Sequence, residues 1–217
     1  GGFVVKVLIT GFDPFGGESV NPAWEAVKAM KDSIDGIEVV KLQVPTVFKK
    51  SAKKLFDGIV EHKPDVVICI GQAGGRYDIS VERVAINTDD GRIPDNEGYQ
   101  PIDSPIYEDG ENAYFATLPI KGIVEEIRSA KIPASVSNTA GTYVCNHIMY
   151  SLLYYISKNN LEIKGGFIHV PYITEQVIDK KNTPYMEVTT ITKALECAVQ
   201  ALNKYKFDIK ISGGKEF

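Results

Sequence analysis

The chain has 217 residues, 44% of them hydrophobic, and a formal net charge of −4 from 24 Lys and Arg against 28 Asp and Glu. This length is enough for one substantial core, so we expect a single domain over residues 1–217, with Gly1 and Gly2 interpreted as an expression remnant and 206–217 as a tail of undecided structure. The negative net charge argues against a basic surface that binds nucleic acid. The lack of an apolar run of ~20 residues argues against a membrane-spanning helix.

Apolar, β-rich stretches alternate along the chain with segments of helical period, and Gly, Pro, Asn or Asp mark most junctions. This alternation predicts an α/β fold. Asn21 is placed to cap a helix whose first turn contains Pro22. In the first part of the chain the pattern predicts strands at about 3–10, 38–44, 65–71 and 79–87, and a second helix at about 47–61.

A long polar stretch rich in Gly and Pro lies between Thr88 and Ala113. A loop of that length inside a compact domain is either functional or disordered, and its GRIPDNEG core favours function. Beyond it the pattern predicts helices at about 120–129, 142–158 and 189–205, and strands at about 134–137 and 165–170. The tail FDIKISGGKEF is either an edge strand or a frayed end.

The three cysteines have different sequence contexts. Cys69, in DVVICIG, and Cys197, in ALECAVQAL, are predicted to be core residues. Cys145 falls in the predicted first turn of a helix, where free N–H groups and the helix dipole favour a thiolate, lower a thiol pKa and can receive an oxyanion. A buried structural thiol is the competing interpretation. An odd number of cysteines without paired spacing indicates neither disulfides nor a metal site, so we expect a cytoplasmic protein without a cofactor.

The histidines also differ. His62 lies at a predicted helix end and is expected to be solvated, and His147 is two residues beyond Cys145, so on a helix its side chain points about 200° away from the thiol. His169 ends the predicted strand 165–170. Its position leaves it as the candidate base for Cys145.

We expect the strand 134–137, the helix 142–158 and the strand 165–170 to form a right-handed parallel crossover. The helix then runs back along the sheet and the next strand returns, which brings Cys145 and His169 to the carboxyl edge of the strands. Open α/β sheets bind their ligands at that edge. The sequence therefore predicts a cysteine nucleophile with a histidine base.

Other residues are expected at the same edge. TGFDPFGG follows the first strand but matches neither the Walker pattern nor GxGxxG, and its Phe12 and Phe15 either contact a flat apolar ligand or pack beneath the loop. Glu82 lies in an otherwise apolar strand, where it either orients the imidazole of the pair or is solvated or paired with Arg83. Arg92, in the long loop, either contacts a carbonyl oxygen or braces the loop.

Four long motifs occur in order along the chain: TGFDPFGG, ISVERVAINTDDGRIPDNEG, SNTAGTYVCNHIMY and GFIHVPYI. Together they resemble the pyrrolidone carboxyl peptidases, also called the pyroglutamyl peptidase I family. The resemblance covers about Val5 to Leu202, and the tail beyond about Asn203 departs from shorter family members. It implies a three-layer α/β/α sandwich with an open, twisted, mostly parallel but mixed sheet, and assembly into homotetramers.

For the site, the resemblance implies a peptidase that removes N-terminal pyroglutamate from peptides, with Cys145 as nucleophile, His169 as general base and then acid, and Glu82 as the orienting acid. Arg92 matches a family arginine near the active cysteine and is assigned an oxyanion or supporting role. The implied substrate pocket consists of Phe12, Phe15, Thr46, Ile93, Tyr143 and Val144, with Asn21 and Gln72 as polar contacts to the lactam.

Two other functions stay open. One is a non-catalytic α/β module that binds a small anionic or nucleotide ligand on its glycine-rich loops. The other is a related Cys/His amidase or glutamine amidotransferase, although the chain has no GxCxG elbow. An unreactive thiol at Cys145 would indicate the first alternative, and turnover of glutaminyl amides would indicate the second.

Overall fold

The structure is a computed structural model that describes residues 2–215. Its strands are β1 (Lys6–Phe12), β2 (Ser33–Ile34), β3 (Ile37–Val44), β4 (Val66–Gln72), β5 (Ile79–Glu82), β6 (Val84–Ile86), β7 (Ala113–Phe115), β8 (Ala134–Ser137) and β9 (Lys164–Val170). Its helices are α1 (Pro22–Lys28), α2 (Phe48–His62), α3 (Ile120–Ser129), α4 (Val144–Lys158), α5 (Val188–Lys204) and the short 3-10 helix η1 (Thr174–Gln176).

The main sheet has seven strands in the order β2-β3-β1-β4-β9-β5-β8, and β6 and β7 form a separate pair. The strands β3, β1, β4 and β9 are parallel to one another. β2 runs antiparallel to β3, β5 runs antiparallel to β9, and β8 is parallel to β5. The sheet is therefore mixed but mostly parallel, as the resemblance implies.

The predicted parallel crossover through 134–137, 142–158 and 165–170 is wrong. β8 pairs with β5, which lies between β8 and β9 and is antiparallel to β9, so β8 and β9 run in opposite directions. The physical reason is that a strand of four residues carries no sign of its direction in its apolar pattern, and the handedness rule applies only to parallel strands.

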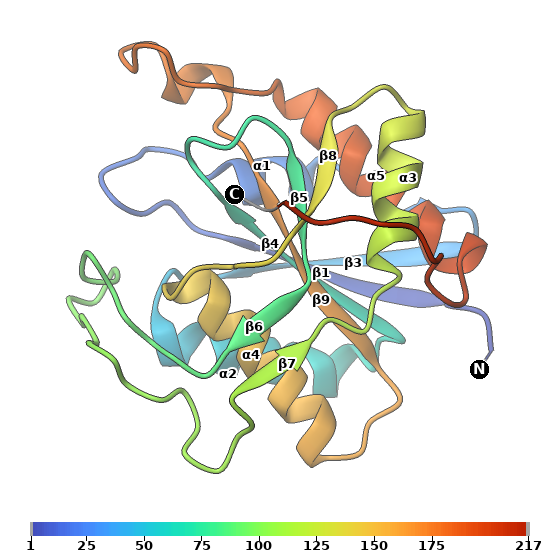
Figure 1. Cartoon of the computed structure of the whole chain (residues 1–217), viewed down its shortest axis with the longest axis horizontal. Coiled ribbons are helices and arrows are strands. Elements are labelled where there is room, and N and C mark those ends of the chain that lie inside the picture. Colours follow the sequence, from blue (N-terminus) through green and yellow to red (C-terminus); the bar gives the residue numbers. More distant parts are fainter. Residues whose placement is uncertain (1, 216–217) are drawn as a thin grey trace.

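Helices cover both faces of the main sheet (Figure 1). The helices α1, α3 and α5 pack on one face and α2 and α4 on the other, and each face buries its own hydrophobic cluster. The central strand β4 is buried on both faces from Val66 to Gly71, as its continuous apolar sequence predicts. The predicted three-layer α/β/α class is confirmed.

Local signals mark several element boundaries correctly. The side chain of Asn21 caps α1, since its Oδ1 accepts a hydrogen bond from the N–H of Ala23 at 3.0 Å. The predicted strand 79–87 is instead two strands interrupted at Arg83, and β6 leaves the main sheet to pair with β7, which the sequence did not indicate. Asn146 of α4 holds β6 in place, because its side chain both accepts from the N–H of Ile86 and donates to its carbonyl.

The long loop between β6 and β7 is irregular but tied to the helices beneath it. α2 has no capping side chain of its own, and the Asp95 carboxylate from this loop accepts from the N–H of Phe48 in its first turn at 3.1 Å. The other Asp95 oxygen accepts from the N–H groups of Glu97 and Tyr99, at 2.9 and 3.0 Å. One carboxylate therefore closes the loop and caps the helix.

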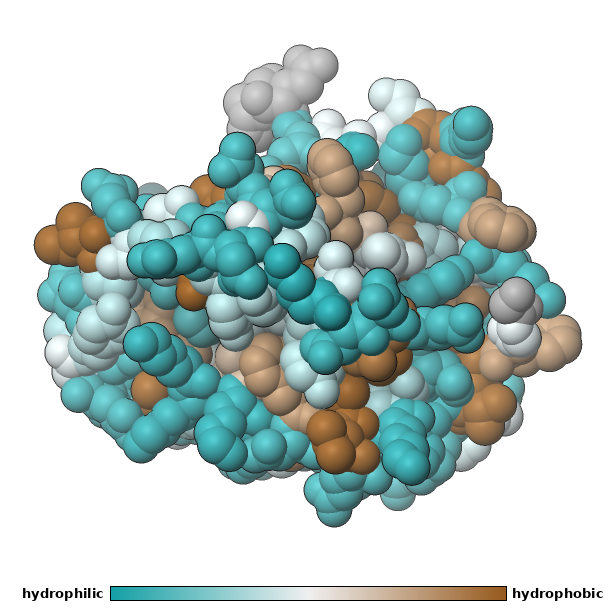
Figure 2. All heavy atoms as spheres, turned by 90° about the horizontal axis from the view of Figure 1, so that it is seen from below, coloured by the Kyte–Doolittle hydropathy of each residue, from teal (hydrophilic) through white to brown (hydrophobic). Residues whose placement is uncertain are grey.

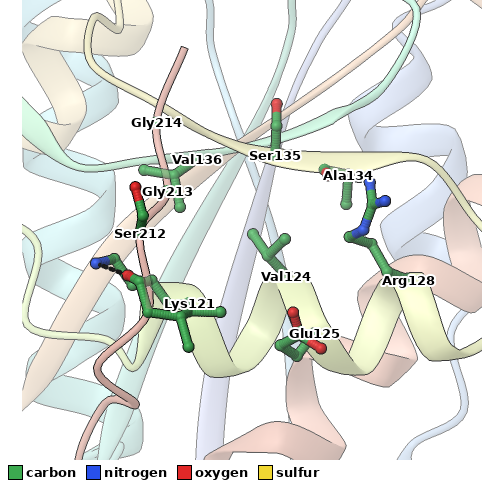
Figure 3. A pocket seen from close by; sticks show the side chains of 11 residues that line it. Lys121, Val124, Glu125, Arg128, Ala134, Ser135, Val136, Ser212, Gly213 and Gly214 are labelled. Atoms are coloured by element: carbon green, nitrogen blue, oxygen red, sulfur yellow. Dashed lines mark hydrogen bonds between the residues drawn. The ribbon is translucent and has the colours of Figure 1, made fainter.

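The tail from 206 to 215 is neither a strand nor a frayed end. The Asp208 carboxylate accepts from the N–H of Gly122 at 3.0 Å and so caps α3, and the Gly213 carbonyl accepts from Arg83 at 2.6 Å. Lys215 pairs with the buried Asp78 carboxylate at 3.1 Å. Figure 3 shows the tail beside α3 and β8, where the three segments line an open pocket of about 200 Å³. The last two residues of the predicted tail lie outside the described residues.

The face below α4 and β7 is mostly hydrophilic, with apolar side chains in separate small groups (Figure 2). In the described part of the chain, no helix combines the length and the apolar character that crossing a membrane requires.

Candidate active site

The thiol of Cys145 lies against β4 at Gly71. A Cβ atom added at Gly71 would stand 2.5 Å from Cys145 Sγ, so only glycine leaves room for the sulfur there. Gly71 is the register partner of His169 on the neighbouring strand β9, and paired residues in a sheet project to the same face. The structure therefore brings Cys145 and His169 to one edge of the sheet, although not by the crossover that the sequence predicted.

The reversed direction of β5 brings Glu82 to His169. Ser80 is the register partner of His169, and Glu82 lies two residues further along the same face of β5. His169 Nδ1 and Glu82 Oε1 are 2.8 Å apart, and the Glu82 side chain is 0% exposed. With Nδ1 donating to the carboxylate, Nε2 of the imidazole is left as the proton acceptor.

Arg76, which the sequence analysis did not single out, also binds Glu82. Its Nη1 lies 2.8 Å from Glu82 Oε1, the same oxygen that His169 contacts. Glu82 is therefore neither solvated nor paired with Arg83, the two alternatives to an orienting role. The signal that could have found Arg76 is its place in GQAGGR, a glycine-rich turn at the carboxyl end of a central strand.

The carboxylate form of Glu82 is favoured by its partners. Burial alone raises the pKa of this carboxyl, but hydrogen bonds and charge from His169, with hydrogen bonds from Ser137 and Arg76, hold the pKa below its ordinary value. Glu82 is thus an anion that can stabilise a positive charge on the imidazole.

The environment of Cys145 differs from the expectation in one respect. The sequence predicted a lowered thiol pKa at the helix start, and Cys145 is indeed the second residue of α4. Burial instead raises the pKa of the Cys145 thiol, Glu82 acts in the same direction, and Arg76 opposes both. Loss of hydration therefore favours the thiol form of the sulfur, against the expected effect of the helix start.

Two of the predicted pocket aromatics have different surroundings. Phe12 is 2% exposed and belongs to the hydrophobic cluster under α2 and α4, so its ring packs beneath the loop, the second of the two predicted alternatives. Phe15 is partly exposed, and its ring centroid lies 6.0 Å from that of Tyr143. Tyr143 in turn donates its hydroxyl to the Pro94 carbonyl, which joins the loop before α4 to the long loop.

The remaining predicted pocket residues fall into two groups. Thr46 is buried and bound to Asp13, and Val144 is 1% exposed, whereas Ile93 is 43% exposed. Asn21 is also buried, with its amide bound to backbone groups at both ends. These contacts position the loops around Cys145.

Gln72 and Arg92 are less directly connected to the thiol. Gln72 follows Gly71, so alternation turns its side chain to the opposite face of β4, where its Oε1 accepts from Gln176 of η1 at 2.8 Å. Arg92 is exposed on the long loop. The guanidinium that contacts the buried carboxylate belongs to Arg76.

The other cysteines and histidines have structural positions. Cys69 and Cys197 are buried, as predicted. His62 lies near Glu61 at the end of α2, and His147 is buried with its Nδ1 2.9 Å from both carboxylate oxygens of Asp89. His147 therefore ties α4 to the long loop and is turned away from the thiol.

Sequence comparison finds relatives over almost the whole chain. The profile of a family described as pyroglutamyl peptidase matches residues 5–205. A protein of Brachyspira hyodysenteriae named pyrrolidone-carboxylate peptidase is 66% identical over 196 residues, which cover 90% of this chain and 98% of that protein. A protein of the same name from Clostridium botulinum is 60% identical over 211 residues, with coverage of 97% and 99%.

Solved structures agree with these matches. The crystal structure of pyroglutamyl peptidase I from Bacillus amyloliquefaciens is 52% identical and has a TM-score of 0.94, covering 97% of this chain and 100% of that chain. The pyrrolidone carboxyl peptidase of Thermococcus litoralis is 43% identical with a TM-score of 0.91, covering 95% and 99%. Fold and sequence thus point to the same group of proteins.

Proposed function

The chain belongs to the pyroglutamyl peptidase family, and we propose that it is a cysteine peptidase that removes N-terminal pyroglutamyl residues from peptides. The observation that carries this proposal is the meeting of three groups at one sheet edge. Cys145 Sγ lies on Gly71, the register partner of His169, and His169 Nδ1 is 2.8 Å from the buried Glu82. This is the order of nucleophile, base and orienting acid that acyl transfer needs.

The reaction follows from the protonation states of these groups. His169 Nε2 takes the proton of the Cys145 thiol as the sulfur attacks the pyroglutamyl carbonyl carbon, and an S–C bond forms. The C–N bond to the next residue then breaks, and the amine leaves with the proton from His169. Water adds to the thioester with His169 again as base, which releases pyroglutamate and restores the thiol.

The raised pKa of the Cys145 thiol affects the first step. Burial and Glu82 both disfavour the thiolate, so we propose that His169 removes the thiol proton as the sulfur attacks. The Glu82 carboxylate then faces an imidazolium, which it stabilises. Free N–H groups at the start of α4 are proposed to receive the oxyanion, with Arg92 as a supporting group from the long loop.

Substrate specificity is proposed to come from the loops in front of Cys145. Phe15 and Tyr143 are placed to hold the flat ring, while Phe12 supports them from the core. Thr46, Ile93 and Val144 are proposed to complete the wall. Asn21 is the polar candidate for the lactam, because the side chain of Gln72, the other predicted contact, is turned to the opposite face of β4 and bound to Gln176.

A prolyl residue lacks the lactam carbonyl, and leaving its buried partner unpaired costs roughly 1–3 kcal/mol. Pyroglutamyl amides should therefore react faster than prolyl or glutaminyl amides. Equal rates on the three would contradict the proposed pocket.

The nucleophile is tested by comparing Cys145→Ser with Cys197→Ala on a pyroglutamyl arylamide. Cys197 is a matched control because it lies on α5, across the sheet from the site, and is 3% exposed. We expect loss of turnover in Cys145→Ser and near-normal turnover in Cys197→Ala. Undiminished hydrolysis by folded Cys145→Ser would reject the proposal, and no turnover by the unaltered protein would favour a binding module.

A cytoplasmic location and a homotetramer are further parts of the proposal; the first follows from the cysteine usage and the second is implied by the family resemblance. Sedimentation equilibrium of the purified protein tests the second. A monomer at micromolar concentration would contradict it.

A further inference from the structure

The guanidinium of Arg76 connects two parts of the site that come from separate elements. Nη1 lies 2.8 Å from Glu82 Oε1 on β5, and Nη2 donates to the Thr139 carbonyl at 3.0 Å. Thr139 lies in the loop that leads from β8 to α4 and Cys145. The two ends of one planar guanidinium group therefore bind the Glu82 carboxylate and the loop that leads to Cys145.

The turn that carries Arg76 is tightly constrained. It follows β4 directly, with the N–H of Arg76 donating to the Ala73 carbonyl at 3.3 Å. Gly75 has a φ of +98°, and a Cβ at Gly74 would stand 2.3 Å from the Tyr172 ring. Both glycines are thus required by this path of the chain, which places the guanidinium at the carboxyl edge of the sheet.

Glu82 depends on few donors. It is 0% exposed, and its Oε2 has no hydrogen-bond partner among the described residues, so its contacts converge on Oε1. Without Arg76, only His169 and the Ser137 hydroxyl would be left as donors to this carboxylate. A buried carboxylate that loses a guanidinium donor is more weakly fixed in orientation and more easily protonated.

We propose that Arg76 is a positioning residue of this site, which fixes the Glu82 carboxylate against His169 and ties it to the loop that carries Cys145. This inference rests on the proposed function, because it assigns a role within the same triad. Arg76 acts through Glu82 and the loop.

The charged and titratable groups that face Glu82 are His169 from β9, Arg76 from the turn after β4, and Cys145 from α4, while Ser137 of β8 contributes a hydroxyl. Arg76 is the fixed cation of this group. Removing it makes proton uptake by its neighbours easier, which moves the acid limb of kcat/KM to higher pH. A residue that merely stabilised the fold would leave that limb in place.

The experiment compares kcat, KM and the pH profile of four proteins on a pyroglutamyl arylamide: the unaltered chain, Arg76→Gln, Arg76→Lys and Arg83→Gln. Arg83 is the matched control because it binds the same loop, through Asn138 Oδ1, but points to the tail instead of Glu82. For Arg76→Gln we expect kcat to fall about tenfold to a hundredfold with little change in KM, as for loss of a partner that orients a functional side chain.

The acid limb of Arg76→Gln should also move up by about 1 pH unit. Arg76→Lys keeps the positive charge but cannot bind Glu82 and Thr139 at the same time, so we expect its kcat to fall while the acid limb of its pH profile stays in place. Arg83→Gln should keep both the kcat and the pH profile of the unaltered chain. An unmoved acid limb with normal kcat in folded Arg76→Gln overturns the proposal. If Arg76→Gln does not fold, a normal kcat in Arg76→Lys overturns it.

The rate of Cys145 alkylation by iodoacetamide against pH gives a readout that needs no turnover. Cys69 and Cys197 are buried and serve as internal references. A pH profile of alkylation that shifts in Arg76→Gln but not in Arg83→Gln supports the positioning role even if the protein hydrolyses no pyroglutamyl amide, in which case the proposed function alone fails. Identical alkylation profiles in all four proteins overturn the positioning role.

Discussion

Replacing Gly71 by alanine tests the placement of the thiol most directly. The added Cβ would lie 2.5 Å from Cys145 Sγ and 2.6 Å from Phe167 Cζ, and the first distance is 0.9 Å short of the 3.4 Å at which ordinary contact begins. Gly71 does not have a positive φ, so alanine fits the backbone and the whole effect comes from the methyl group. Both the sulfur and the ring must move.

The size of the effect follows from that displacement. A misplacement of about 1 Å in a catalytic group can cost about 100-fold in rate, so kcat/KM on a pyroglutamyl arylamide should fall by that order in Gly71→Ala. Overpacking should also destabilise the fold by about 1–3 kcal/mol. For a chain of this length the melting temperature then falls by roughly 2–12 °C.

The assay is initial rates measured well below the melting transition, with Gly213→Ala as the control. A Cβ at Gly213 would meet its nearest atom, Lys121 Cε, at 3.7 Å, which is ordinary contact. The control should keep normal rates. If kcat/KM of Gly71→Ala stays within about threefold of the unaltered protein, Cys145 Sγ does not occupy the position described above.

Three further predictions concern charge, capping and thiol chemistry. The pKa of Glu82 is lower in the folded than in the unfolded chain, so its contribution to stability is present above the unfolded pKa and is lost as pH falls through the folded value. In urea unfolding, the unaltered chain should therefore have a higher free energy of unfolding than Glu82→Gln, and this difference should shrink on acidification. A difference in free energy of unfolding that does not change with pH would contradict the prediction. Removing the α3 cap with Asp208→Ala should cost about 1 kcal/mol, whereas Glu108→Ala, on an exposed loop, should cost almost nothing in the same thermal melts. Because burial raises the pKa of Cys145, its alkylation rate should keep rising above the ordinary thiol pKa of ~8.5, and a plateau near neutral pH would indicate a preformed thiolate.

Much of the fold follows from local signals. The predicted helix 120–129 and strand 134–137 agree with α3 and β8, because Pro119 and Pro133 directly precede them and their apolar periods are regular. The buried run of β4 has the composition of a central strand, and Asn21 has the side chain that a helix start requires. Interactions within a few residues determine these elements, so one sequence is enough to find them.

The parts that were missed depend on contacts distant in sequence. The direction of β5 is seen only in its pairing with β9, almost ninety residues away. The departure of β6 from the main sheet depends on its pairing with β7 and on its hydrogen bonds to Asn146. Arg76 faces Glu82 only because β5 reverses, so its role does not appear in the GQAGGR motif alone. Cys145 and His169 lie at one edge of the sheet, but the connection from which the sequence predicted this is not the one in the structure.

The Asp95 carboxylate caps α2 and also closes a turn of the long loop, which limits how far this loop can move without cost. Lifting the loop away would strip α2 of its cap, at a cost of about 1 kcal/mol, and would open the loop's own turn at the same time. The long loop and the start of α2 are therefore coupled through Asp95. We expect the hydrogen-exchange rates of the Phe48 and Tyr99 amides to change in the same direction whenever conditions or mutations change one of them. The long loop is thus held in one shape before any peptide binds, and under the proposed function the substrate would have to conform to it.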